Sequence, residues 1–197
     1  MNLIEKVPLT GASMPLPAFV EHLQLGTGFT DDGAQNAVLE TCLLGAIYTV
    51  EARTGKKLIS RAYDWIVSQW RLAEGEQEFP VAPVSKVTRL RMYRANGTSA
   101  IIGITKYALR FDSVRPRIYP TTGSLPTIET HGWAVVSFFA GYGTWDKVPG
   151  DLQQAVMMLA AFYYENRDGM VAESAQIPLA VSVLLEPHKR LRIGVVR

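Results

Sequence analysis

Two segments with helical periodicity enclose a long stretch with strand patterning, and this order restricts the chain to an α+β fold. In both segments, 32–54 and 149–167, apolar side chains recur every three or four residues, as on the buried face of a helix. Gly55 follows the first segment and suits the left-handed residue at which many helices end. The second segment is apolar on nearly all sides, which predicts burial by several neighbours, some of them from other subunits. The side chains predicted to pack between subunits are Val156, Leu159 and Tyr163.

Two shorter helices, 17–25 and 178–187, are predicted to flank the long ones, because each begins at a proline, which suits a first helical turn. The four helices would form a small helical core within a single domain, residues 1–190. The last residues, 191–197, read LRIGVVR, an extended pattern with little to pack against in its own chain. We therefore predict an extended C-terminal tail after the domain.

The stretch between the long helices, residues 57–146, is predicted to be a β-rich insertion. Its segment VSKVTRLRMY alternates, so that every second side chain points to the same face of a strand. Asn96-Gly97 follows directly and is the strongest short-range signal for a tight hairpin. The side chains predicted to share one face of this strand are Val87, Arg89, Arg91 and Tyr93.

Basic residues are unevenly distributed, although the formal net charge of the 197-residue chain is only +2. Between residues 84 and 119, Asp112 is the only acidic residue among many basic ones, and the tail after Glu186 has no acidic residue. Such local bias suggests an acidic partner or nearby phosphate, although ordinary solvated strand faces explain it equally well. The basic residues of the first stretch are Lys86, Arg89, Arg91, Arg94, Lys106, Arg110, Arg115 and Arg117.

The sequence contains no constellation of residues typical of an enzyme, a metal site or a cofactor site. Cys42 is the only cysteine, which excludes an internal disulfide, and its place on the apolar face of its helix indicates a buried structural thiol. The histidines show no metal-ligand spacing, and no Gly-x-Ser-x-Gly nucleophile motif occurs. The longest apolar run, 155–164, is about half the length of a membrane span, and the N-terminus lacks a signal-peptide pattern. We therefore expect no enzymatic activity, no cofactor and no membrane contact, in a reducing cytoplasm.

A nucleic-acid-associated structural binding module is the main alternative. Arg89 and Arg91 beside Tyr93 would form a platform that contacts phosphates and stacks on bases. No nucleic-acid-binding motif occurs, however, and the net charge of the whole chain is low. A small hydrolase is a weaker alternative, since the chain lacks a recognisable pair of base and nucleophile.

Several short motifs occur in a particular order between residues 17 and 190. They are AFVEHLQL at 18–25, DD at 31–32, VEARTGK at 50–56, FP at 79–80, PV at 83–84, AGYG at 140–143, VP at 148–149, YYENR at 163–167 and PHKR at 187–190. Each motif alone is explained as a cap, a turn or a core stripe. In this order, they resemble the head–tail connector (adaptor) family of long-tailed phages and gene transfer agents.

The resemblance implies a non-enzymatic structural subunit in the neck of a phage or gene transfer agent particle, assembled in the bacterial cytoplasm. Such adaptors form a homo-oligomeric ring, usually of twelve copies, which is docked on the portal protein and followed by a stopper or tail-terminator protein. DNA passes through the ring without sequence recognition.

The resemblance also suggests roles for two basic regions. The extended tail would add a strand to a portal subunit by β-augmentation. Arg89, Arg91 and Arg94 would face the channel or an acidic neighbour. The predicted portal-docking residues are Lys189, Arg190, Leu191, Arg192, Ile193, Val195, Val196 and Arg197.

Overall fold

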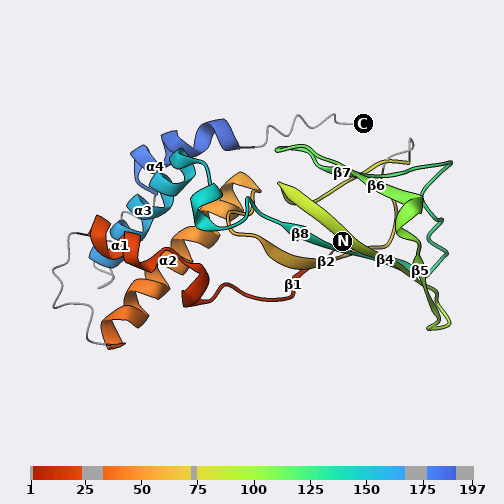
Figure 1. Cartoon of the computed structure of the whole chain (residues 1–197), viewed down its shortest axis with the longest axis horizontal. Coiled ribbons are helices and arrows are strands. Elements are labelled where there is room, and N and C mark those ends of the chain that lie inside the picture. Colours follow the sequence, from red (N-terminus) through yellow and green to blue (C-terminus); the bar gives the residue numbers. More distant parts are fainter. Residues whose placement is uncertain (1, 24–32, 72–74, 167–176, 190–197) are drawn as a thin grey trace. The chain divides into compact units, whose positions relative to one another are not determined.

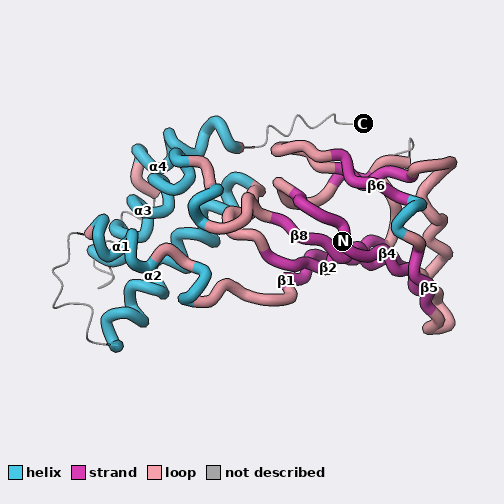
Figure 2. The backbone as a smooth tube through the Cα atoms, viewed as in Figure 1, coloured by secondary structure: helices cyan, strands magenta, loops and turns pink. Residues whose placement is uncertain are grey.

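A computed structural model describes residues 2–23, 33–71, 75–166 and 177–189 of the chain. It contains helices and two antiparallel sheets, which confirms the predicted α+β class (Figure 1, Figure 2). The chain divides into two compact units. The β unit comprises Met1–Pro8 and Ile59–Tyr142, and the helical unit comprises Leu9–Leu58 and Gly143–Arg197. The assignment of residues 1–190 to a single domain stays a prediction, and the predicted tail, 191–197, lies outside the described residues.

The helical unit is built on the contact between the two long helices. Its helices are α1 (Leu16–His22), α2 (Gly33–Thr54), α3 (Gly150–Glu165) and α4 (Leu179–Leu185), with short 3-10 turns at Gly11–Ser13, Trp145–Lys147 and Glu186–His188. The helix α2 packs along α3, α4 packs on α3, and α1 packs on α2. The apolar residues at helical spacing predicted this core. The DD motif at 31–32, directly before α2, lies outside the described residues.

The end of α2 is fixed by its own side chains. Gly55 has a φ of 69°, and its N–H donates to the Glu51 carbonyl at 2.9 Å, which confirms it as the left-handed residue after the helix. The Thr54 hydroxyl donates to the Val50 carbonyl at 2.8 Å and accepts the Lys56 N–H at 3.2 Å. The VEARTGK motif therefore encodes a helix stop.

The β unit consists of two antiparallel sheets. The larger sheet has the order β1-β2-β8-β4-β5, and the smaller has the order β3-β7-β6. One hydrophobic cluster contains side chains of both sheets, and within it the Phe79 ring contacts the rings of Trp65 and Phe138. The strands are β1 (Asn2–Glu5), β2 (Arg61–Val67), β3 (Gln77–Glu78), β4 (Val84–Tyr93), β5 (Ser99–Ile102), β6 (Tyr107–Arg110), β7 (Arg117–Pro120) and β8 (Trp133–Ala140).

Strand β4 differs from the simple alternation that its sequence predicts. Its pairing with β8 is shifted twice, between Val84 and Lys86 and between Val87 and Arg89. Each shift inserts an extra residue and reverses the side to which the following side chains point. Val87 is therefore buried in the core, and the prediction that it shares a face with Arg89 is wrong. The hairpin after β4 is confirmed, because β4 pairs antiparallel with β5 through the Asn96-Gly97 turn.

Candidate interaction surfaces

The larger sheet buries one face in the β-unit core and leaves the other side partly open to solvent. We call this second side the open face. Along β2, every second side chain is buried, and the side chains between them are partly exposed. Strand pairing extends the open face to both edges, since Ile4 lies opposite Asp64 and Ile101 lies opposite Arg91. The open face comprises Asn2, Ile4, Ala62, Asp64, Ile66, Lys86, Arg89, Arg91, Tyr93, Ser99, Ile101, Trp133, Val135, Ser137 and Phe139.

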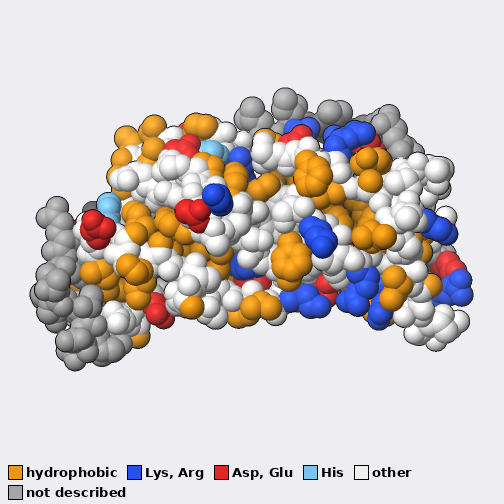
Figure 3. Space-filling model, viewed as in Figure 1, with side chains coloured by type: hydrophobic (Ala, Val, Ile, Leu, Met, Phe, Trp, Pro, Cys, Tyr) orange, Lys and Arg blue, Asp and Glu red, His pale blue; other side chains and the backbone are white. Residues whose placement is uncertain are grey.

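Two of the three predicted arginines lie on the open face. Arg89 is exposed, whereas Arg91 is half-buried, with its guanidinium carbon 6.0 Å from the centre of the Tyr93 ring. Tyr93 in turn stacks on Trp133, with ring centres 5.2 Å apart and planes 9° apart. Sequence reasoning missed Trp133, because only the pairing of β4 with β8 brings it beside Tyr93. Figure 3 shows basic side chains gathered over the part of the molecule that Figure 1 labels β4 and β5.

The third predicted arginine, Arg94, already has an acidic partner. Its Nε atom lies 3.1 Å from the Glu129 carboxylate, and both side chains are mostly exposed. An exposed ion pair of this kind contributes little to stability. It nevertheless gives the Arg94 guanidinium a carboxylate partner within its own chain. Arg94 is thereby set apart from Arg89 and Arg91.

The acidic residue on the open face is also occupied. Asp64 accepts a hydrogen bond of 2.6 Å from the Ser137 hydroxyl and forms an ion pair of 3.3 Å with Lys6. The open face therefore keeps a surplus of positive charge from Lys86, Arg89 and Arg91.

The residues predicted to pack between subunits are mostly used within the helical unit. Val156 and Leu159 are fully buried in that unit, so their surface is not available to another subunit, and this prediction is corrected for both. Tyr163 is partly exposed, and its hydroxyl lies 3.2 Å from the Thr49 hydroxyl on α2. The apolar stripe of α3 is filled by the chain's own helices α2 and α4.

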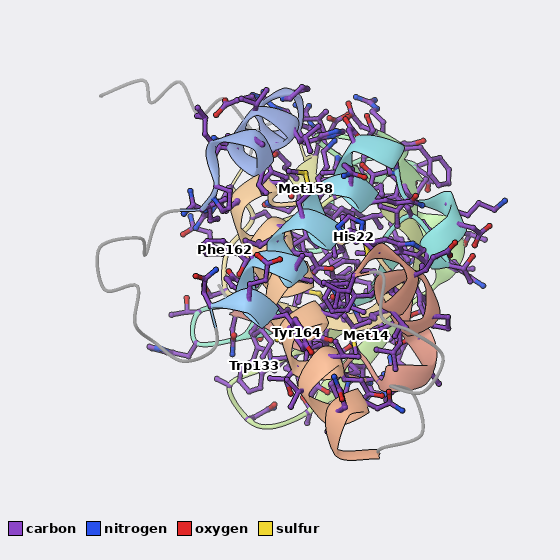
Figure 4. All side chains as sticks on the ribbon, turned by 90° about the vertical axis from the view of Figure 1, so that its left-hand side faces the viewer. Met14, His22, Trp133, Met158, Phe162 and Tyr164 are labelled. Carbon is purple, nitrogen blue, oxygen red and sulfur yellow. The ribbon has the colours of Figure 1, made fainter. Side chains whose placement is uncertain are left out.

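Met158 and Phe162 are among the partly exposed apolar side chains of α3, and sequence reasoning did not select them (Figure 4). The spacing of apolar residues indicated that α3 is buried. It could not indicate which face of α3 stays exposed after the chain's own helices have packed on it. Glu165 and Gln154 are exposed on the same helix.

Of the predicted portal-docking residues, Lys189 is described, whereas 190–197 lie outside the described residues. The residue before it, His188, is held on both sides. Its Nε2 atom lies 2.5 Å from Asp151 Oδ2, and its Nδ1 atom lies 3.3 Å from the Lys56 ammonium. Because an ammonium group can only donate, we assign Nδ1 as the acceptor and Nε2–H as the donor to Asp151. His188 thus ties the short 3-10 turn Glu186–His188 to the beginning of α3.

The contact between Asp151 and His188 predicts a pH-dependent contribution to stability. Burial raises the pKa of the Asp151 carboxyl, but hydrogen bonds from His188 and from the Leu152 N–H outweigh it and hold this pKa below its ordinary value. A carboxyl with a lowered pKa stabilises the fold above its unfolded-state pKa, and this stability is lost as the pH falls through the folded-state value. We expect Asp151→Asn to cost about 1 kcal/mol at pH 7, or a few degrees in Tm.

Thermal unfolding of the variant and the original chain at pH 7 and pH 3.5 checks this expectation. The difference in Tm should be large at pH 7 and smaller at pH 3.5, where this carboxyl binds protons more readily in the unfolded chain than in the folded one. Glu186→Gln, an exposed change on the same segment, serves as the control. An equal difference at both pH values would contradict the assigned role of Asp151.

The described part of the chain contains neither a candidate metal site nor a candidate membrane helix. No three His, Cys, Asp or Glu side chains there are grouped closely enough to hold a metal ion. Among the same residues, no helix combines the length and apolar character needed to cross a bilayer.

No protein-family model and no curated protein sequence matches the chain. Solved structures do match. A chain from the "neck of empty GTA particle computed with C6 symmetry", where GTA stands for gene transfer agent, is 39% identical, with full coverage of both chains and a TM-score of 0.89. The protein belongs to the head–tail connector family of gene transfer agents.

Two further structures agree with this assignment to the connectors. A chain of the "virion of native gene transfer agent (GTA) particle" is 39% identical, with 100% and 99% coverage and a TM-score of 0.87. A chain of the "neck of native GTA particle computed with C12 symmetry" is 36% identical, with full coverage of both chains and a TM-score of 0.84. The connector is therefore a structural subunit of a particle neck and forms part of a ring oligomer. The family predicted from the order of its motifs is confirmed.

Proposed function

We propose that twelve copies of this connector form a ring that docks on the portal protein and is followed by a stopper or tail-terminator protein. DNA passes through the channel of this ring without sequence recognition. The observation that carries the proposal is the similarity to neck chains over the full length of both partners. The C12 symmetry of one neck supports twelve copies. The C6 symmetry of the other neck is compatible with this number, because C6 is a subgroup of C12.

Electron microscopy of particles that contain this chain tests the proposal. We expect twelve copies in one ring, with one contact to the portal and another to the next neck component. A chain located in the capsid shell, or missing from the particles, would overturn the proposal.

The proposed attachment to the portal depends on the C-terminal tail. Deleting 190–197 is expected to leave heads without attached connectors, because the tail would add main-chain hydrogen bonds to a portal strand. A full-length variant with Arg190, Arg192 and Arg197 replaced by Gln should still dock, since it keeps the strand and its backbone groups. Negative-stain microscopy and connector content of purified heads measure both results. Normal docking of the deletion variant would show that the tail is dispensable.

The contacts of His188, shortly before the tail, support this role of the tail. Its hydrogen bonds to Asp151 and Lys56 hold the residue three positions before the tail at a defined point of the helical unit. A fixed attachment point lowers the entropy lost when a segment binds its partner. This geometry supports a tail that acts as an arm from a rigid base.

A further inference from the structure

We infer that the open face of the larger sheet is the surface by which each connector contacts the acidic helical unit of the next copy in the ring. The inference rests on the proposed ring and names the partner of the basic strand β4. It selects a neighbouring subunit, and not the DNA of the channel, as the group that Arg89 and Arg91 face.

The first support is a group of exposed apolar side chains on the open face. Ile4, Ile101, Trp133 and Phe139 are 43%, 60%, 36% and 40% exposed, and they come from β1, β5 and β8. The opposite side of the same sheet already forms the β-unit core with the smaller sheet. Exposed apolar groups that extend across a sheet and are not needed by its own core are typical of a protein interaction surface.

The second support is the state of the arginines among these apolar groups. In the described part of the chain, neither Arg89 nor Arg91 forms an ion pair, in contrast to Arg94 with Glu129. Arg91 lies beside the Tyr93 ring, and its Nε atom is buried without a hydrogen-bond partner. Arginine with stacked aromatic rings is the composition of the centre of protein interfaces.

This composition argues against DNA as the occupant. A surface that follows a DNA backbone gains from solvated basic side chains that can reach phosphates. On the open face, Arg91 is instead held against the sheet, and Ile101 and Phe139 would stay in contact with water in a channel. Burial of these two side chains against protein would remove that cost.

The third support is the complementary charge of the helical unit. The β unit carries more basic than acidic residues, whereas the helical unit carries more acidic than basic ones. On α3, the partly exposed Met158 and Phe162 are accompanied by the exposed Glu165, a mixture of apolar and acidic groups that suits the open face. A cyclic ring needs two different patches that meet head to tail, and these two units supply them.

Site-specific cross-linking in assembled particles tests the inference. Cys42→Ser removes the only cysteine, and Ile101→Cys then places a single thiol on the open face for a benzophenone maleimide. We expect irradiation to give a product of two copies, about twice the 21.8 kDa of one chain, with the attached peptide in the helical unit. Thr122→Cys, exposed in the loop after β7, is the matched control and should give no such product.

Other products have defined meanings. Cross-links to DNA, to a different neck protein or to the β unit of the next copy would each overturn the inference while the ring itself stands. Equal labelling of Ile101→Cys in the free chain and in particles would overturn it as well. Absence of the chain from particles would instead overturn the proposed function itself. Failure of the proposed function and failure of the inferred contact are therefore distinguishable.

Charge reversal gives a second measurement that needs no label. Arg89→Glu with Arg91→Glu should lower incorporation into rings at least tenfold, because like charges would then face each other. Arg115→Glu, an exposed change in a loop of the same unit, should leave incorporation unchanged. Circular dichroism of the free chains establishes that all variants fold, and normal incorporation of the double variant would overturn the inference.

Discussion

Gly141→Ala is expected to prevent stable folding of the β unit. A Cβ atom at this position would lie 2.6 Å from the carbonyl group of Ile59 and from the Cα atom of Ser60, which is backbone that cannot turn aside. The φ of Gly141 is 127°, a conformation that residues with a side chain rarely adopt. The N–H of Gly141 also donates to the Pro83 carbonyl at 3.0 Å, so a shift of this residue disturbs the start of β4.

The two effects together should cost more than about 3 kcal/mol, since strain of the backbone alone costs about 1–3 kcal/mol. Thermal unfolding followed by circular dichroism should show a Tm lower by about 6–12 °C or more, or no folded protein at all. Gly143→Ala is the matched control. Its φ of 124° carries the same strain, but its Cβ would meet only the flexible Lys147 side chain at 3.6 Å. If both variants lost the same stability, the close approach of the backbones would not be the cause.

Glu51→Ala is expected to have the second largest effect, on the helical unit. The Glu51 carboxylate is almost fully buried, where it accepts the Leu58 N–H at 2.9 Å and the Lys57 ammonium at 2.9 Å. Alanine would remove both acceptors and leave the positive charge of the largely buried Lys57 without this carboxylate. Removing one partner of a buried ion pair costs about 3–5 kcal/mol, and partial exposure of Lys57 places the expected cost near 3 kcal/mol.

Glu51→Gln separates the two roles of this carboxylate. Its amide oxygen can still accept the Leu58 N–H, whereas its charge is lost, so about half of the effect should remain. Urea unfolding measured for the three chains checks the order of stability, and Arg53→Ala, an exposed change on the same helical turn, serves as the control. A stability of Glu51→Ala within 1 kcal/mol of the original chain would contradict the assigned role.

The parts of the fold that depend on neighbours in the sequence were predictable. The apolar stripes of the long helices, the glycine after Thr54 and the Asn96-Gly97 hairpin each need only a few adjacent residues. Their order along the chain also led to the connector family, which structural similarity then confirmed. Local patterns therefore sufficed for the fold class and the family.

The parts that depend on distant pairing were not predictable. The two shifts in β4 arise from its pairing with β8, which lies some forty residues later in the sequence, so Val87 was placed on the wrong face. The same pairing places Trp133 beside Tyr93. On α3, an apolar stripe indicates burial, but it does not indicate whether the covering atoms belong to the same chain or to another subunit. This explains the correction of Val156 and Leu159.

The long separation of α2 and α3 has a consequence for synthesis of the chain. Between the end of α2 and the beginning of α3 lie 95 residues, 55–149, and the ribosome adds about 5–20 residues each second. The apolar side of α2 must therefore wait for roughly 5–20 s before its main packing partner has been made. During that interval Leu39, Leu43 and Ile47 of a nascent connector lack the helix that covers them in the folded chain.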